Sequence, residues 1–527
     1  MDHNISLITT LAAAFSVALI FGFLAERIKV PALVGYLVAG ILIGPGTPGF
    51  VADVHLASQL SEVGIMLLMF GVGLHFSLKD LLAVKRIAVP GALVQMALAT
   101  ILGMAVTWWW GWSWGAGLIF GLSLSCASTV VLLKALEARG VLESMNGRIA
   151  VGWLIVEDLV TVLVLVLLPP LAGVLGGSVV EVASSQPLWV TIGKTLLQVA
   201  AFIAIMLVAG RRVLPWLLWQ VSRTGSRELF TLSVVVAAIG IAYGAAQLFS
   251  VSFALGAFFA GMVMRESEFS HRAAEESLPL RDAFSVLFFV SVGMLFEPTI
   301  MLKQPIHVLG VVAIIIFGKS IAALAIVLAL RYPLNTALTV SASLAQIGEF
   351  SFILAGLGLS LGLLPAEGMS LVLAGALISI ALNPMLFVTI EPVRRWVLKR
   401  SELARRLEQR TDPYAELPIT TERKYLQGQV VLVGYGRVGK RIADALEARG
   451  IPYVVAEQNR ELVEYLRKKG IMAVSGNAAD PAVLIQAHIA DAAMLVVATH
   501  DPLNTRQIAE TARTLNADIE VVLRTHS

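Results

Sequence analysis

The sequence predicts an all-α polytopic membrane domain of about thirteen helices, built as inverted repeats with broken helices and followed by a C-terminal α/β domain of the Rossmann type. The first reason is composition: 57% of the 527 residues are apolar, 14% are charged and the mean hydropathy is +0.82, as in a chain embedded largely in a bilayer. The second is a regular series of apolar stretches up to about residue 395. The third is a change near residue 429 to alternating strand and helix patterns.

Composition also excludes some partners and some processing. The net charge is only +3 and no basic cluster contains interleaved aromatic residues, which excludes nucleic acid as a partner. The single cysteine, Cys126, excludes an intrachain disulfide and is expected to be a small core residue. The N-terminus lacks a basic segment and a small-residue cleavage site, so Ile5 to Leu24 is expected to be a retained first span.

Thirteen apolar stretches have lengths suited to crossing a bilayer, although the second and the ninth are short. Lys and Arg gather in alternate connections, with Lys303 as the clear exception. Because positive loops stay in the cytoplasm, the N-terminus is predicted outside and the C-terminus in the cytoplasm. The approximate bounds are 5–25, 31–45, 57–77, 87–110, 115–136, 148–174, 189–210, 228–248, 251–264, 281–297, 306–331, 334–362 and 367–393.

These spans divide into six, one and six, and the odd linker inverts the second six relative to the first, as in an inverted repeat. The fifth span of each half carries a small, hydroxyl-rich stretch, Gly121 to Thr129 and Ser341 to Ser351. Such stretches at mid-membrane suit unwound helices, whose freed carbonyl groups and helix ends can face an ion. Close helix packing would explain either stretch alone, but their matched positions favour broken helices.

Two adjacent carboxylates, Glu157 and Asp158, lie in the middle of the sixth span. A central Asp costs roughly 2.5–3.5 kcal/mol on insertion scales, so such residues persist where they face a cavity, a partner charge or an ion. We predict an ion or proton site here, with a structural ion pair between helices as the alternative. Neighbouring helix residues point about 100° apart, so the two carboxylates are not expected to face one small site together.

The predicted ion site is centred on Asp158. A monovalent cation prefers oxygen ligands, which Asp158, Ser128, Thr129 and the nearby backbone would supply. A carboxyl group withdrawn from water can exchange a proton for a cation near neutral pH, which is the core of antiport. No separate metal site and no catalytic residue are predicted. The candidate ion- and proton-binding residues are Asp158, Glu157, Lys319, Ser128, Thr129, Gln346 and Glu349.

Lys319 is a second charge near the middle of its span. A buried lysine needs a partner or loses its proton, and Lys319 could pair with Glu157 or Asp158 and release it when a cation binds. Snorkelling to the interface is the alternative. For Glu349, structural support of the broken helix by accepting backbone N–H bonds is favoured over proton carriage.

The predicted domains are a transmembrane exchange domain at 1–395, a charged linker at 396–428 and a nucleotide-binding regulatory domain at 429–527. Strands are expected near 430–433, 452–456, 472–475, 494–498 and 519–523, with helices between several of them, which predicts a doubly wound parallel sheet. The chain stops soon after the fifth strand, and a natural end or a trimmed one both fit this point.

A glycine motif opens the soluble domain. Gly434, Gly436 and Gly439 follow a strand and precede a helix, and the acidic residue Glu457 lies 21 residues after Gly436. In this context the glycines allow a tight turn, close approach of a pyrophosphate and packing of helix on strand, while the helix N-terminus attracts phosphate. A Rossmann-like fold without a ligand is the alternative.

Glu457 would accept hydrogen bonds from ribose hydroxyls and repel a 2′-phosphate, which favours NAD(H) or an adenine mononucleotide such as AMP over NADP. Because no substrate domain or catalytic base accompanies the motif, the nucleotide is expected to be a regulator and not a catalytic cofactor. The candidate contacts are Gly434, Tyr435, Gly436, Arg437, Val438, Gly439, Glu457, Gln458, Asn477, Ala478 and Thr499.

Several of these motifs together resemble the monovalent cation:proton antiporter-2 superfamily over about the first 395 residues, with a module like that of potassium-conductance regulators after it. This is the Kef-type architecture. The motifs that carry the resemblance are Phe288 to Met294, Gly348-Glu349-Phe350, Glu157-Asp158, Gly434 to Gly439, and Gly476-Asn477-Ala478.

The resemblance implies a homodimer in a bacterial inner membrane, an elevator-like motion, and gating by the cytoplasmic module. Asp158 matches the superfamily's ion- and proton-binding aspartate, and Lys319 matches a lysine of several sodium-type members. The segment from His271 to Glu276, expected in a cytoplasmic loop, resembles the Kef regulatory loop and is a candidate contact for the module, although a solvated surface is the simpler interpretation. Kef proteins carry Gln where Glu157 stands and electrogenic sodium exchangers carry Asp-Asp, so the Glu-Asp pair leaves cation choice and stoichiometry open.

The sequence therefore predicts a monovalent cation/proton antiporter that favours K⁺ over Na⁺ and is regulated by a nucleotide; it is not expected to be an enzyme. One rival is a ligand-gated potassium efflux channel on the same scaffold, which would move ions without obligatory proton movement. Another is a membrane-bound NAD-dependent oxidoreductase, which the absence of haem, flavin or iron–sulfur ligand sets disfavours.

The topology can be tested at Lys303. The thirteen-span arrangement predicts that a Lys303→Cys variant reacts with a membrane-impermeant maleimide added outside intact cells. Reaction only after the cytoplasmic side is opened would contradict the arrangement.

Overall fold

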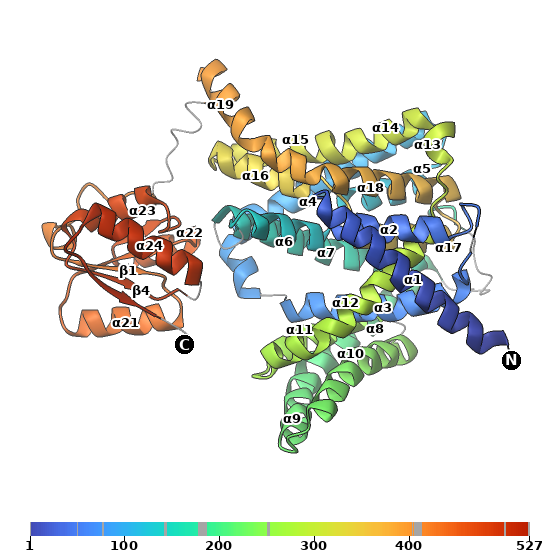
Figure 1. Ribbon diagram of the computed structural model, residues 1–527, viewed down its shortest axis with the longest axis horizontal. Helices are drawn as coiled ribbons and strands as arrows, with labels where there is room; N and C mark the ends of the chain where they lie inside the picture. The colour runs from blue at the N-terminus through green and yellow to red at the C-terminus, as the bar shows by residue number, and fades with distance from the viewer. Residues whose placement is uncertain are drawn as a thin grey trace.

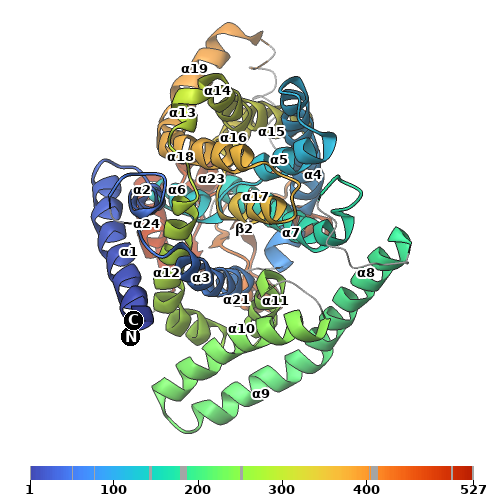
Figure 2. The ribbon, with the colours of Figure 1, turned by 90° about the vertical axis from the view of Figure 1, so that its right-hand side faces the viewer.

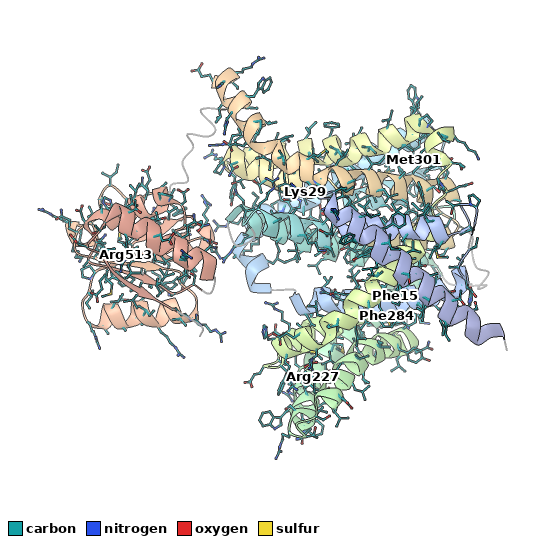
Figure 3. The ribbon with its side chains drawn as sticks, viewed as in Figure 1. Phe15, Lys29, Arg227, Phe284, Met301 and Arg513 are labelled. Carbon is teal, nitrogen blue, oxygen red and sulfur yellow. The ribbon has the colours of Figure 1, made fainter. Side chains whose placement is uncertain are left out.

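The computed structural model describes residues 2–49, 51–75, 78–141, 145–177, 187–249, 253–402, 404, 414–499 and 502–524. A large helical body lies beside a smaller α/β module, and the N-terminus is at the end of the body away from the module (Figure 1). Figure 3 places Met301 at that same far end of the body, opposite the module that carries Arg513.

One part of the helical body packs through close helix contacts. A Cβ on Gly40 of α2 would collide with the backbone of α12, and a Cβ on Gly293 of α12 would collide with the backbone of α2. Gly73 of α3 and Gly261 of α11 allow the same close approach between those two helices. The helices of this part are α1 (Asp2–Arg27), α2 (Ala32–Ile43), α3 (Val54–His75), α8 (Leu188–Ile205), α9 (Arg211–Ser222), α10 (Arg227–Phe249), α11 (Phe253–Arg265) and α12 (Ser270–Met294).

The other part, called here the broken-helix bundle, contains both interrupted helices. The break between α5 and α6 spans Cys126 to Ser128, and the pair α16 and α17 bends by 44° at Ala345 to Gly348. A π-helical turn, Ile314–Gly318, directly precedes Lys319. The bundle comprises α4 (Leu78–Trp109), α5 (Trp114–Ser125), α6 (Thr129–Ala138), α7 (Met145–Leu171), α14 (Pro305–Ala313), α15 (Lys319–Ala329), α16 (Leu334–Leu344), α17 (Glu349–Ser360) and α18 (Ala366–Val388).

The described residues contain 10 helices long and apolar enough to cross a membrane, or 11 if the bent pair α16–α17 counts as one span. The second and ninth predicted spans correspond to two shorter apolar helices, Ala32–Ile43 and Phe253–Arg265. Every predicted span therefore has a helical counterpart, and the predicted broken helices are confirmed in the fifth span of each half.

Two boundaries differ from the prediction. The predicted seventh span ends at 210, yet α8 continues through a π-helical turn, Met206–Gly210, into α9, forming one long helix on the outside of the body beside α10 (Figure 2). The His271 to Glu276 segment forms the first turns of α12, so the prediction of a loop there is wrong. Charged residues end an apolar run without ending a helix, which explains both errors.

Two short helices flank this bundle in the chain: α13 (Ile300–Lys303) precedes α14, and α19 (Ile390–Arg400) extends α18 toward the module. Tyr414, in the predicted linker, is bonded to the module: its carbonyl oxygen accepts the Ser475 N–H at 2.7 Å.

The module is a parallel five-stranded sheet in the order β3-β2-β1-β4-β5, as predicted for a doubly wound fold. Sequence reasoning missed the short helix α23, which is six residues long. The elements are β1 (Val430–Val433), α21 (Arg437–Ala448), β2 (Tyr453–Glu457), α22 (Arg460–Lys468), β3 (Ala473–Ser475), α23 (Pro481–Gln486), β4 (Met494–Val497), α24 (Pro502–Leu515) and β5 (Glu520–Leu523).

Candidate functional site

The two helix breaks cross each other inside the broken-helix bundle. The Gln346 side chain joins them: its Oε1 accepts the Ser128 N–H at 2.7 Å, and its Nε2 donates to the carbonyl oxygens of Ser128 at 3.2 Å and Ser343 at 3.0 Å. Gly348 permits this approach, because a Cβ there would collide with the Ser128 side chain. The breaks are therefore locked together by hydrogen bonds that satisfy backbone groups freed from the helices.

Glu349 lies at the start of α17 and also at the start of α6. Its carboxylate accepts the Ser128 hydroxyl at 2.8 Å and the Thr129 N–H at 3.2 Å. A carboxylate at two helix N-termini is stabilised by their positive dipole ends and free N–H groups. This geometry is the one expected of a structural support for the break.

Glu157 and Asp158 on α7 bond to different residues at the α5–α6 break. Glu157 Oε2 accepts the Ala127 N–H at 3.1 Å, and Asp158 Oδ2 accepts the Thr129 hydroxyl at 3.1 Å. Both carboxyl groups are buried, and Glu157 Oε1 and Asp158 Oδ1 have no hydrogen-bond partner among the described residues. Each carboxylate thus keeps one acceptor oxygen unpaired in a setting where an unpaired polar atom is costly.

Lys319 is fully buried and donates from Nζ to the Gln346 carbonyl oxygen at 3.0 Å. Within the described ranges, no ion pair within 4.0 Å joins Lys319 to Glu157 or Asp158. The lysine therefore supports the second break at Gln346, the same residue whose side chain accepts the Ser128 N–H.

The structure thus gathers all seven predicted ion-site residues at one crossing, on chain segments that are distant in sequence. Oxygen atoms surround it: carboxylates, the Ser128 and Thr129 hydroxyls, and carbonyls of the broken helices. This donor set suits a monovalent cation, a proton or both in alternation.

Sequence reasoning missed two buried amides near the crossing. Gln95 on α4 accepts the Trp153 indole N–H at 3.4 Å, and its Nε2 finds no acceptor in the described part of the chain. Asn383 on α18 donates to the Ala342 carbonyl at 2.8 Å, and its Oδ1 finds no donor there either. Each is an isolated amide within an apolar run, which is the signal that would have identified it.

The predicted nucleotide contacts meet at the carboxyl edge of the module's sheet. The glycine loop follows β1, Gln458 follows β2, Asn477 and Ala478 follow β3, and Thr499 follows β4. The carboxyl ends of neighbouring parallel strands form the ligand-binding edge of doubly wound sheets. Gly434 has a φ of +89°, which suits the tight turn predicted there. Gly439 lies so close to Gly434 that a Cβ on Gly439 would collide with the Gly434 carbonyl, which agrees with the close helix–strand packing predicted for Gly439.

Glu457 is nearly buried at the end of β2 and organises the edge. Its Oε2 accepts the Tyr435 N–H at 2.7 Å and its Oε1 accepts the Asn459 N–H at 3.0 Å. The Thr499 hydroxyl is buried without a hydrogen-bond partner among the residues that the structure describes. The edge therefore offers a fixed carboxylate, an unpaired hydroxyl and a helix N-terminus, which are groups that a nucleotide can use.

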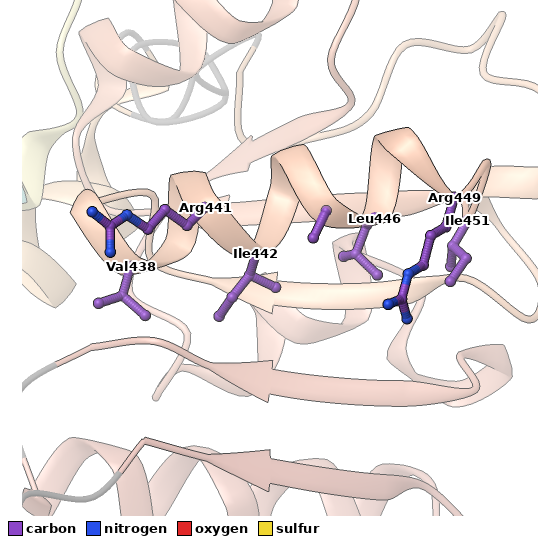
Figure 4. A pocket seen from close by; sticks show the side chains of 7 residues that line it. Val438, Arg441, Ile442, Leu446, Arg449 and Ile451 are labelled. Atoms are coloured by element: carbon purple, nitrogen blue, oxygen red, sulfur yellow. The ribbon is translucent and has the colours of Figure 1, made fainter.

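A separate shallow groove runs along α21, lined by Val438, Ile442, Leu446 and Ile451 with Arg441 and Arg449 at its sides (Figure 4). It follows the helix and takes in one candidate nucleotide contact, Val438 of the glycine motif. Its lining does not include Glu457, Tyr435 or Asn459.

The His271 segment packs within the membrane domain. His271 pairs with Glu275 of its own helix at 3.0 Å, Glu276 accepts from Arg227 at 3.2 Å, and Arg272 lies 4.0 Å from the Phe230 ring centroid. The module instead contacts α4 through an ion pair between Arg86 and Glu464 at 3.3 Å.

Family models match both parts of the chain. Residues 14–390 match the family described as sodium/hydrogen exchanger, transmembrane, and residues 430–527 match the TrkA-N domain. The chain belongs to the sodium/hydrogen exchanger family. Its C-terminal module is a TrkA-N domain, which agrees with the Rossmann-like module predicted there.

Curated relatives are similar to this chain along most of its length. The chain is 53% identical over 527 residues to "Putative cation/proton antiporter YbaL" of Escherichia coli (strain K12), covering 100% of this chain and 92% of that protein. It is 30% identical over 500 residues to "Putative K(+) efflux antiporter KefB" of Alkalimonas amylolytica, covering 95% and 73% of the two chains. These matches confirm the predicted Kef-type resemblance.

A solved structure supports the fold of the membrane domain. The sodium proton antiporter MjNhaP1 from Methanocaldococcus jannaschii superposes with a TM-score of 0.58 at 15% identity, covering 76% of this chain and 99% of that one. At this identity the match identifies the fold alone.

The contact between the breaks can be tested at Gly348. We expect Gly348→Ala to destabilise the protein by about 1–3 kcal/mol through overpacking against Ser128. Thermal unfolding of the detergent-purified protein would report this. Gly356→Ala, on the same helix with open space around it, is the matched control and should leave the melting temperature unchanged or raise it. Equal melting temperatures for the two variants would contradict the close approach.

Proposed function

We propose that the protein is a cation/proton antiporter that exchanges K⁺ for H⁺ across a bacterial inner membrane. The observation that carries the proposal is the unpaired Asp158 Oδ1, buried at the crossing of two broken helices. An acceptor oxygen there is stabilised by a proton or by a cation, and the two compete for it. The names of the relatives, a cation/proton antiporter and a K⁺ efflux antiporter, support the same activity.

The exchange uses the groups already described. When Asp158 is deprotonated, its carboxylate together with the Thr129 and Ser128 hydroxyls and the nearby backbone carbonyls replaces part of the hydration shell of a cation. When Asp158 is protonated, the cation loses its counter-charge and leaves. Alternation of the site between the two sides of the membrane then exchanges one ion for the other.

Glu157 and Lys319 complete the charge balance. Glu157 accepts from Ala127 whereas Asp158 accepts from Thr129, and we assign Glu157 to a second proton-carrying role. Lys319, held by the Gln346 carbonyl, supplies a positive charge beside the site when no cation is present. The choice of K⁺ over Na⁺ rests on the relative named for K⁺ efflux, and Na⁺ is the alternative that the family description offers.

We further propose that the module binds AMP or NAD(H) at the carboxyl edge of its sheet and regulates transport from the cytoplasm. The fixed Glu457 carboxylate, the unpaired Thr499 hydroxyl and the glycine loop support a nucleotide with free ribose hydroxyls. The protein acts as a homodimer with one module in each subunit, and it is a transporter, not an enzyme.

Proton flux in proteoliposomes tests the antiport. With a pH-sensitive dye inside, adding K⁺ should drive proton release from the wild type. Asp158→Asn should abolish this exchange, because an amide cannot carry the proton. Asp282→Asn, the same change at an exposed carboxylate, is the control and should retain activity. Cation flux without proton movement that survives in Asp158→Asn would contradict antiport and favour a channel, and a response to Na⁺ alone would correct the ion.

Nucleotide titration of the full-length protein tests the ligand site. Glu457→Ala should weaken AMP or NAD binding by about ten-fold or more, the usual effect of losing a charged hydrogen-bond acceptor. Glu447→Ala removes an exposed carboxylate of the same module and should bind as the wild type does. Unchanged affinity in Glu457→Ala would refute the ribose contact, and no binding by the wild type would refute the nucleotide site itself.

A further inference from the structure

In the part of the chain that the structure describes, the module touches the membrane domain through a short stretch that follows β2. Arg86 on α4 donates to both carboxylate oxygens of Glu464 at 3.3 Å, and Lys468, one turn along the same helix as Glu464, pairs with Glu464 Oε1 at 3.0 Å. Glu464 is the more buried partner, with 14% of its side chain exposed against 66% for Arg86. The contact is therefore a specific charge pair in which the acidic side is fixed by its own helix.

The residues just before Glu464 extend this contact. Gln458, Asn459 and Arg460 line a small cavity whose other wall is formed by the cytoplasmic ends of membrane helices, including Val84, Arg148 and Tyr332. The Arg460 guanidinium lies 5.5 Å from the centroid of the Tyr332 ring, within the range of a cation–π contact. We call residues Gln458 to Glu464 the docking segment.

The docking segment begins immediately after the residue that would hold the ribose. Glu457 Oε1 accepts the Asn459 N–H at 3.0 Å, and Asn459 Oδ1 in turn accepts the Leu462 N–H at 3.2 Å, which caps α22. One carboxylate therefore orients the glycine loop through Tyr435 and the start of α22 through Asn459.

The membrane side of the contact is equally direct. Arg148 lies in the first turn of α7, the helix that carries Glu157 and Asp158. Tyr332 is followed by Pro333, the N-cap residue of α16, and the other end of α16 adjoins the second break. Arg86 lies on α4, which packs against both α7 and α15. All these contacts fall on the broken-helix bundle.

We propose that the docking segment is the surface through which nucleotide occupancy controls the motion of the broken-helix bundle. The inference rests on the proposed antiport and nucleotide functions and names the path between them. Ribose hydroxyls that engage the Glu457 carboxylate compete with the Tyr435 and Asn459 N–H groups for its oxygens. The start of α22 shifts in response, and the Arg86–Glu464 and Arg460–Tyr332 contacts change with it.

The size of the contact suits such control. The contacts named above for the described residues include a partly exposed ion pair and a cation–π contact, and such contacts are individually weak, so we expect the docked and released arrangements to be close in free energy. A nucleotide needs only a modest difference in affinity for the two arrangements to shift their populations. A large apolar interface would not respond in this way.

Charge exchange at the ion pair tests the proposal. Transport by the full-length protein in proteoliposomes is measured with and without saturating nucleotide for the wild type, Arg86→Glu, the double variant Arg86→Glu/Glu464→Arg, and Arg395→Glu. We expect a change of about five-fold or more on nucleotide addition in the wild type, the lower range of ordinary allosteric coupling. The change should vanish in Arg86→Glu and return in the double variant. Arg395→Glu removes an exposed arginine whose partner, Glu391, lies on its own helix, and should respond as the wild type does.

The outcomes separate this inference from the function on which it rests. Each variant is first titrated with nucleotide, so that a lost response is not a loss of binding. A wild type that transports and binds nucleotide but ignores it overturns both the proposed regulation and this path. If nucleotide changes transport equally in the wild type and in Arg86→Glu, the proposed path through the docking segment is overturned, while the proposed regulation by nucleotide stands.

A cross-link gives an independent measure. The one native cysteine, Cys126, is buried, so an Arg86→Cys/Glu464→Cys variant carries its only accessible thiols on the two sides of the contact. Arg86 and Glu464 meet through the ends of long side chains, so a flexible bis-maleimide is used to join the shorter cysteines. Cross-linking should be at least about two-fold slower or faster when nucleotide is bound, as a shift between docked and released arrangements requires. A rate that nucleotide leaves unchanged contradicts a nucleotide-dependent contact.

Discussion

The pairing of two helix breaks in the middle of the membrane domain is the constraint on which the rest depends. Hydrocarbon offers no water, so every N–H and carbonyl freed by unwinding must find a partner within the protein. Gln346 meets this need for Ser128 from 218 residues away, and Glu349 meets it for the start of α6. Because the breaks satisfy each other, the acceptors left unpaired beside them in the described ranges are side-chain oxygens, namely one from each carboxylate of α7 and the Asn383 amide oxygen.

Much of this arrangement could be predicted from local sequence. Two adjacent acids in an apolar run, and small hydroxyl-rich stretches at matched positions, identify the site because a bilayer makes such residues costly unless they bind an ion, a proton or a partner charge. The module was predictable for a similar reason: a glycine motif between a buried strand and a helix, with Glu457 at the right spacing, depends on short-range geometry alone.

What could not be predicted depends on pairing between distant segments. Nothing near Lys319 indicates that its partner is the Gln346 carbonyl and not Glu157, because helix packing decides which oxygen it reaches. The charges of the His271 segment suggest a loop, since charge marks the membrane boundary but not the helix end. Likewise, a sequence gives no sign that Arg86 meets Glu464, since exposed charges of opposite sign are common on any surface.

The π-helical turn before Lys319 has a consequence for how this chain tolerates insertions and deletions. A π turn contains one residue more than the α-helical turn it replaces. The wider turn absorbs this residue, so five residues cover about the rotation that four make in an α-helix. Deleting one residue between Ile314 and Gly318 would therefore restore a regular helix and leave α15 at nearly its present angle relative to α14. Rewinding the same five residues as α-helix would instead rotate α15 by about 100° and turn the buried ammonium away from the second break. The segment before Lys319 thus tolerates a one-residue deletion better than a change that straightens the turn.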